Sequence, residues 1–206
     1  MTGKASRPDP TFQILTVGLP IASRLPCVED ELDRIDKHAN KFTILRLNES
    51  AATVDNVIDG MKQSSWVHFA CHGEQKVSNP TESALLLANG SRLTLSKIIQ
   101  LHLPHADLAF LSACQTATGT EVLAEEAVHL TAGLLLAGYR GVIGTMWSIM
   151  DKDAPDVADE VYTELLSMDK PDSSQAAYAL HVAVKNLRQK PNQSFFSWVP
   201  FVHFGI

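Results

Sequence analysis

The segment WVHFACHG (residues 66–73) decides the fold class, because an apolar run ends abruptly at a histidine and a glycine. A second apolar run, LAFL (108–111), ends in the same way at SACQT (112–116). Short apolar runs with β-branched and aromatic members predict strands buried on both faces of a parallel sheet. Open α/β sheets place their ligands at the carboxyl ends of such strands. We therefore expect two core strands that deliver His72 and Cys114 to one edge of the sheet.

The length and composition are those of one globular domain. The chain has 206 residues, of which 45% are hydrophobic and 19% charged. A net charge of −6, with no basic run, argues against a nucleic-acid partner, because phosphate binding needs clustered Lys and Arg. The longest nearly apolar stretch, residues 130–137, is far below the roughly 20 residues of a membrane span, so we expect no membrane segment.

The cysteines and the N-terminus point to a reducing compartment. Three cysteines form an odd set without a disulfide-like arrangement, which favours the cytosol or nucleus, and we expect a cytoplasmic protein. Residues 1–10 are polar and lack the apolar core of a signal peptide. We predict a disordered leader over 1–11 and a single domain over 12–206.

Strand patterns alternate with helical patterns, which predicts a three-layer α/β/α sandwich around a mostly parallel sheet of about six strands. The expected strands are 12–19, 42–47, 65–71, 108–111, 142–147 and 201–206. The expected helices are 29–39, 53–62, 95–101, 121–138, 153–166 and 172–188. Asn89-Gly90 between the runs 84–87 and 92–95 predicts a small β-hairpin, since both residues tolerate positive φ. Residues 74–82 are expected to form a loop.

A thiol and an imidazole at one sheet edge form a potential nucleophile pair. A thiolate attacks carbonyl carbon, and a neighbouring imidazole takes the thiol proton and later protonates the leaving amine. Gly73 lets its backbone amide approach a substrate oxygen, and the amide of Cys114 is a candidate second oxyanion donor. The alternative is structural, because free cysteines are often inert packing and single histidines usually belong to the core.

A zinc site built from Cys71, His72 and Cys114 is a weaker alternative. Neighbouring residues of a strand point to opposite faces, so Cys71 and His72 are poorly placed to hold one ion. The chain also lacks a Cys-x-x-Cys pair or an evident fourth ligand. We expect no metal and no cofactor, and we interpret Cys71 as a core residue.

Four segments together resemble the CHAT domain, a family of caspase-like cysteine peptidases in the clan of caspases, metacaspases and separase. HFACHG (68–73) and LSACQTATG (111–119) are similar to its two signature segments. GYRGVIGTMW (138–147) is similar to the strand after the nucleophile helix, and WVPFV (198–202) to the last strand. The resemblance implies a caspase-like fold over nearly the whole chain.

The resemblance also implies a cysteine endopeptidase. His72 is then the general base and acid, Cys114 the nucleophile, and the amides of Gly73 and Cys114 the oxyanion donors. The expected partner is a protein or peptide substrate, in a regulated pathway of defence or cell death. A regulatory protein or helical-repeat region outside this chain is a further expected partner. Two alternatives stay open, namely a latent signalling or scaffold module and a small-molecule acyl hydrolase.

The segment after the predicted strand 142–147 supplies the candidate substrate contacts. Trp147 is expected to border the substrate, and Asp151 and Asp153 to border a pocket that favours a basic P1 residue. The alternative for Asp153 is that its carboxylate caps the helix that follows. His68 and the other histidines have no partner pattern, and we assign them no role.

Overall fold

The computed structural model describes residues 12–19, 25–74, 76, 78–112, 114–115, 127–147, 149–167 and 170–206. The predicted leader over 1–11 and the first part of the predicted helix 121–138 lie outside these residues.

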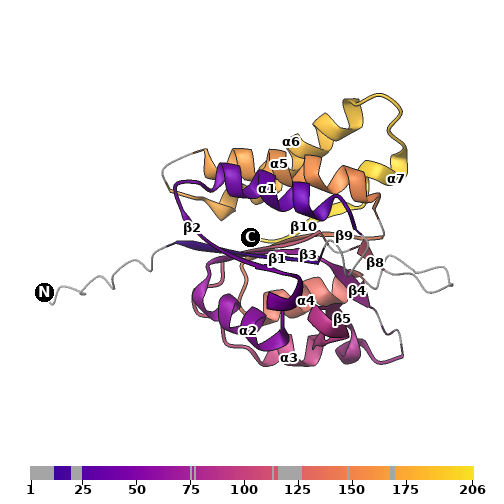
Figure 1. The fold of residues 1–206 in the computed structure, drawn as a ribbon. Coiled ribbons are helices and arrows are strands. Elements are labelled where there is room, and N and C mark those ends of the chain that lie inside the picture. Colours follow the sequence, from indigo (N-terminus) through magenta and orange to yellow (C-terminus); the bar gives the residue numbers. More distant parts are fainter. Residues whose placement is uncertain are drawn as a thin grey trace, which may run out of the picture.

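A six-stranded sheet forms the middle of the molecule, as predicted (Figure 1). Its strand order is β10-β9-β7-β3-β1-β2. The strands are β1 Gln13–Gly18, β2 Thr43–Asn48, β3 Trp66–Ala70, β7 Leu108–Leu111, β9 Gly141–Thr145 and β10 Phe201–Gly205. All neighbouring pairs are parallel except β10 with β9, so the sheet is mixed at one edge.

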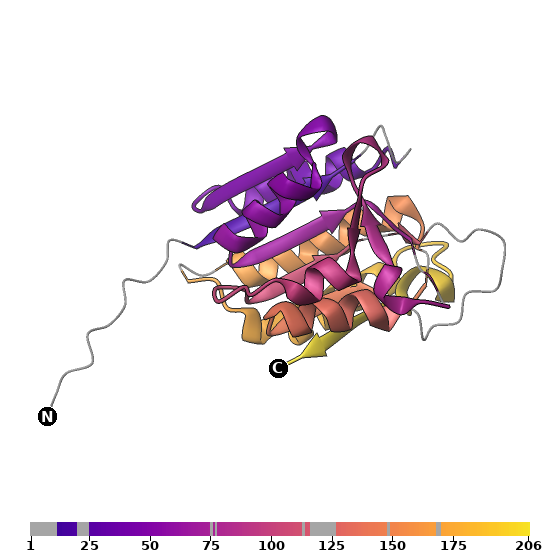
Figure 2. The same ribbon diagram turned by 90° about the horizontal axis from the view of Figure 1, so that it is seen from below.

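Helices cover both faces of this sheet, which confirms the three-layer prediction (Figure 1). One layer consists of α1 Val28–His38, α5 Ala154–Leu166 and α6 Ala176–Gln189. The other consists of α2 Val54–Gln63, α3 Leu95–Gln100 and α4 Ala127–Ala137, which lie below the sheet in Figure 1 and in front of it in Figure 2, the view from below. A short helix, α7 Phe195–Trp198, precedes β10. The 3-10 turns are η1 Glu49–Ala51, η2 Pro80–Glu82, η3 Ala88–Gly90, η5 Asp151–Asp153 and η6 Ser173–Gln175.

The strands are apolar on both faces because both faces are covered. Ile14, Trp66 and Phe110 pack in the core cluster shared with α1, α5 and α6, while Val67 and Phe69 pack in the cluster shared with α2, α3 and α4. All five side chains are fully buried. Alternation along a strand sends successive residues to opposite faces, so a continuous apolar run is what a doubly covered parallel strand requires.

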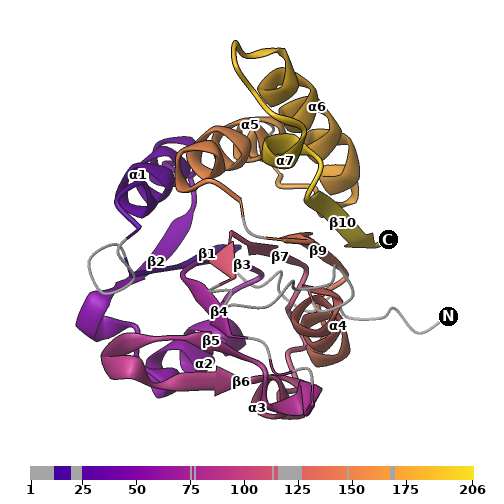
Figure 3. The same cartoon turned by 90° about the vertical axis from the view of Figure 1, so that its right-hand side faces the viewer.

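A second, four-stranded sheet extends the predicted hairpin. Its order is β6-β5-β4-β8, with β4 His72–Glu74, β5 Ala84–Leu86, β6 Arg92–Thr94 and β8 Cys114–Gln115. The hairpin of β5 and β6 turns at Asn89 and Gly90, whose φ values of 57° and 71° confirm the predicted turn. His72 lies just past the end of β3, as predicted, but the prediction of a loop from residue 74 was wrong at Glu74, because His72–Glu74 form a short strand that pairs with the hairpin (Figure 3).

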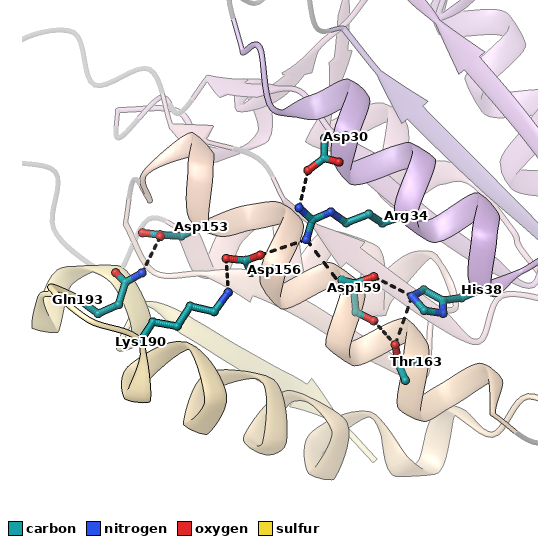
Figure 4. A network of polar contacts seen from close by, with 9 residues as sticks. All are labelled: Asp30, Arg34, His38, Asp153, Asp156, Asp159, Thr163, Lys190 and Gln193. Carbon is teal, nitrogen blue, oxygen red and sulfur yellow. Dashed lines mark hydrogen bonds and ion pairs between the residues drawn. The ribbon is translucent and has the colours of Figure 1, made fainter.

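Ion pairs connect the three helices of the α1–α5–α6 layer (Figure 4). The guanidinium of Arg34 on α1 lies 3.0 Å from a carboxylate oxygen of Asp156 on α5, and Lys190, just after α6, lies 2.6 Å from the other oxygen. His38 lies 2.7 Å from Asp159 in the same layer. These side chains are partly exposed, so each pair stabilises the layer only modestly.

Candidate active site

His72 and Cys114 lie directly opposite each other on neighbouring strands. Strands β4 and β8 run parallel, and their register pairs His72 with Cys114 and Gly73 with Gln115. Neighbouring strands are about 4.8 Å apart, so the two backbones are as close as strand pairing allows.

This register is the same as the register of the core sheet. In the main sheet β3 pairs with β7, and Phe69 is opposite Leu111, a separation of 42 residues. The pair formed by His72 and Cys114 has the same separation of 42 residues. The amide of Ser112 donates to the carbonyl of Phe69 at 2.9 Å and continues the ladder past the end of β7. The segments that follow β3 and β7 therefore keep the register of the core sheet, and they pair again as β4 and β8.

The surroundings of His72 come from the second sheet. The His72 residue is half-buried and Gly73 is buried. Gly73 lies between two strands, in register with Leu85 of β5 as well as with Gln115 of β8. The oxyanion role of the Gly73 and Cys114 amides stays a prediction.

The predicted substrate contacts lie on the segment that follows β9. The Trp147 ring lies edge-on to the ring of Phe196 at 6.4 Å between centroids. The Trp147 Nε1 atom is buried and has no hydrogen-bond partner within the described part of the chain. Asp151 accepts a hydrogen bond from the backbone N–H of Cys27 at 2.9 Å.

Asp153 does not cap the helix that follows it. It occupies the position before α5, but its side chain makes no capping hydrogen bond, which overturns that alternative. One carboxylate oxygen accepts a hydrogen bond from Nε2 of Gln193 at 3.1 Å (Figure 4). The other oxygen is buried and has no partner among the described residues, in a residue that is only 1% exposed. The carboxylate of Asp153 is thus buried, and only one of its two oxygens accepts a hydrogen bond from the described residues.

A buried polar contact behind β3 involves residues that the sequence patterns left without a role. His68 Nε2 lies 3.0 Å from a Glu31 carboxylate oxygen on α1, and the Tyr162 hydroxyl on α5 lies 3.4 Å from Nδ1. The exposed fractions of His68, Glu31 and Tyr162 are 0%, 1% and 1%. Burial, and then the charge of Glu31, raises the pKa of the Tyr162 hydroxyl. This contact fixes β3 to two helices only four residues before His72.

A signal for this contact was present in α1. Glu31 falls on the stripe of Val28, Leu32 and Ile35, which is the buried face of that helix. A carboxylate on an apolar helical stripe requires a buried partner, and His68 is the polar residue inside an apolar strand.

Cys71 is fully buried in the core cluster that faces α2, α3 and α4, which confirms its prediction as a core residue. Across the residues that the structure describes, no group of three or more His, Cys, Asp or Glu side chains is placed to hold a metal ion. Within the same ranges, no helix combines the length and apolar character needed to cross a membrane.

The fold is similar to that of solved structures of two cysteine proteases and of separase. The structure is similar to the Arg-specific cysteine proteinase gingipain R, with a TM-score of 0.61 and 14% identity over 95% of this chain and 46% of that chain. It is similar to separase in the Saccharomyces cerevisiae separase–securin complex, with a TM-score of 0.58 and 14% identity over 96% of this chain and 12% of that chain.

A third similar structure is a secreted C11 cysteine protease from Bacteroides thetaiotaomicron in complex with an irreversible peptide inhibitor. The TM-score is 0.55 and the identity 14%, over 91% of this chain and 63% of that chain. The chain thus spans less than two thirds of each of these proteins. None of the curated proteins matches it.

The sequence itself matches the CHAT domain over residues 4–206, which is nearly its whole length. The paired His-Gly and Ser-Ala-Cys segments and the mixed six-stranded sheet agree with that match. The chain therefore belongs to the CHAT domain family.

Proposed function

We propose that the chain is a cysteine endopeptidase in which Cys114 attacks a peptide carbonyl and His72 carries the proton. The observation that supports this most strongly is the register that pairs His72 with Cys114 across two parallel strands. Residues in register on neighbouring strands are those whose side chains share a face of the sheet, as a nucleophile and its base require.

The proposed reaction has two halves. His72 accepts the Cys114 thiol proton, and the thiolate attacks the carbonyl carbon to give a tetrahedral oxyanion. The amides of Gly73 and Cys114 donate hydrogen bonds to that oxyanion. The imidazolium then protonates the leaving amine, the C–N bond breaks, and a thioester remains on Cys114. In the second half His72 takes a proton from water and hydroxide adds to the thioester carbon. The C–S bond then breaks, the carboxylic acid is released, and the imidazolium returns its proton to the Cys114 sulfur.

The biological setting is also part of the proposal. The substrate is a protein or peptide, cleaved in the cytoplasm in a regulated defence or cell-death pathway. A reducing compartment keeps the catalytic thiol free of disulfides. One structural neighbour is in complex with securin and another with a peptide inhibitor, which supports a protein or peptide as the partner class.

A peptide-cleavage experiment tests the proposal. The purified chain is incubated with a diverse peptide pool, and the products are sequenced by mass spectrometry. Wild type and Cys27→Ser should cut the same bonds, while Cys114→Ala and His72→Ala should leave them intact. If the wild type cuts no peptide, or if Cys114→Ala cuts as wild type does, the peptidase proposal fails. The first of these outcomes would favour the latent signalling module.

We further propose that Asp151 and Asp153 border the pocket for a basic P1 side chain. One oxygen of Asp153 is buried and has no partner among the described residues, which supports this, because a buried acceptor that lacks a donor is a favourable site for an arginine or lysine. Trp147 lies on the same segment after β9, and we propose that it flanks the bound peptide. One structural neighbour is an Arg-specific proteinase.

Asp153→Asn should lower the preference for arginine over leucine at P1 by roughly 30-fold, which corresponds to about 2 kcal/mol for a lost buried charge pair. The measurement is the ratio of kcat/KM for two peptides that differ only at P1. Asp151→Ala should lower the same ratio by a smaller factor, since Asp151 is less buried. Asp55→Asn, on the exposed side of α2, is the matched control. An unchanged ratio in both pocket variants would remove Asp151 and Asp153 from the pocket.

A further inference from the structure

A groove between α6 and α7 lies apart from the His72 side of the molecule. It encloses about 650 Å³ and is lined by His181, Val184, Lys185, Arg188, Gln189 and Trp198. Figure 3 shows α6 and α7 on the opposite side of the main sheet from β4, β5 and β6. The groove is therefore separate from the strands that carry His72 and Gly73.

The groove is positively charged in a chain that is negative overall. Helix α6 contains Lys185 and Arg188 and no acidic residue, while the net charge of the chain is −6. Both cations are exposed, and neither forms an ion pair with a carboxylate of the described residues. In contrast, Arg34, Arg46 and Lys190, which do not line the groove, are all paired with carboxylates. The cations of the groove are thus free to meet charges from another molecule.

One of the two cations is held in place by an aromatic ring. The guanidinium carbon of Arg188 lies 5.1 Å from the centre of the Trp198 ring. A guanidinium stacked on an indole keeps its N–H edge available, and that edge matches a carboxylate. Lys185 adds a flexible ammonium one turn away, and Val184 is a half-buried apolar residue beside it.

Exposed aromatic side chains of α7 lie next to Trp198 of the groove. The Phe195 ring lies edge-on to Trp198 at 5.2 Å, although Phe195 is 60% exposed. Phe196 next to it is 70% exposed. Large exposed aromatics beside unpaired cations are the composition of a protein-binding surface.

We propose that this groove binds an acidic segment of a partner protein, in which two carboxylates pair with Arg188 and Lys185 and an apolar side chain packs on Trp198 and Phe195. The volume falls in the range of sites that hold a few side chains. The charge fits a short acidic peptide better than a nucleic acid. Nucleic-acid faces usually contact about six or more phosphates, and the negative remainder of this chain repels a long polyanion.

The test uses fluorescein-labelled octapeptides that carry three glutamates and one leucine or phenylalanine in varied positions. Their binding to the chain with Cys114→Ala, which prevents cleavage, is followed by fluorescence anisotropy at physiological salt. We expect saturable binding that disappears when the glutamates are replaced by glutamine. Lys185→Glu should weaken the binding at least about tenfold, because a charge reversal adds repulsion to the lost ion pair.

The matched control is Lys97→Glu on α3. Lys97 is also exposed, lies in the opposite helix layer, and its reversal gives the same net charge as Lys185→Glu. The proposal predicts unchanged binding for Lys97→Glu. It is overturned if no octapeptide binds more tightly than about 1 mM, or if both variants weaken binding equally. It is also overturned if single-stranded oligonucleotide or inorganic phosphate displaces the peptide at lower concentration than the unlabelled peptide does.

Discussion

Replacing His72 with alanine lowers kcat for the best peptide substrate by about 10²- to 10⁴-fold, the usual contribution of a general base and acid. Cys114→Ala lowers it by about 10⁶-fold, because no other group of the site replaces the nucleophile. The register that places the two residues opposite each other is the structural reason for this sensitivity. The measurement is single-turnover cleavage of a peptide chosen from the pool experiment.

The double variant gives the sharper result. Residues that act as one unit have strongly non-additive effects, so His72→Ala should cost nothing further in the Cys114→Ala background. The control is His102→Ala, since His102 is an exposed residue in the segment before β7. Additive losses, or equal losses for His72→Ala and His102→Ala, would show that His72 is not the base of Cys114.

Glu31→Ala destabilises the fold by about 3 kcal/mol, the usual cost of removing one member of a buried polar or charged pair. Glu31 and His68 are both almost fully buried and 3.0 Å apart, so neither solvent nor a nearby side chain is expected to satisfy the atom left behind. In a chain of this length the melting temperature should fall by roughly 6–12 °C. Urea or thermal unfolding followed by circular dichroism measures it.

Two further variants separate the contact from general effects on α1 and its neighbours. Glu164→Ala, on the exposed face of α5, should change stability by less than about 0.5 kcal/mol. Glu31→Leu combined with His68→Phe should lose less stability than Glu31→Ala, because it removes both polar partners together. A Glu31→Ala protein as stable as Glu164→Ala would contradict the described role of the contact.

Local sequence patterns predicted the parts of the fold that depend on local chemistry. The apolar run 108–111 fits a doubly covered strand, and Asn89-Gly90 fits a turn that needs positive φ. The buried strands and that hairpin accordingly lie where they were predicted. The end points of two apolar runs also indicated that His72 and Cys114 would lie at one edge of the sheet, and the two residues are in register on β4 and β8.

What the sequence patterns missed depends on distant partners. Strand β4 has only three residues, and it is a strand because β5 and β8 lie on either side of it. The polar partners of His68 are Glu31 of α1 and Tyr162 of α5, which lie 37 and 94 residues away in sequence. Capping of its own helix was the alternative role for Asp153, but its carboxylate accepts a hydrogen bond from Gln193, which is 40 residues away. Such pairings follow from the packing of layers and have no local periodicity.

Cys27 and Cys71 serve as internal comparisons in a direct test of the proposed Cys114–His72 dyad. The chain has three cysteines, and Cys71 is fully buried. Burial, with the neighbouring Asp151, raises the pKa of the Cys27 thiol, so little of it is thiolate at neutral pH. Thiolates, not thiols, react with iodoacetamide, and a neighbouring imidazolium increases the thiolate fraction.

The most direct measurement is therefore the rate of iodoacetamide labelling at each cysteine near pH 6.5, read by peptide mass spectrometry in wild type and His72→Ala. The proposed dyad predicts that Cys114 is labelled first in the wild type and that this labelling slows at least about tenfold in His72→Ala, while the slow labelling of Cys27 is the same in both. Labelling of Cys27 with Cys114 unreacted, or a Cys114 rate that does not depend on His72, would contradict the dyad.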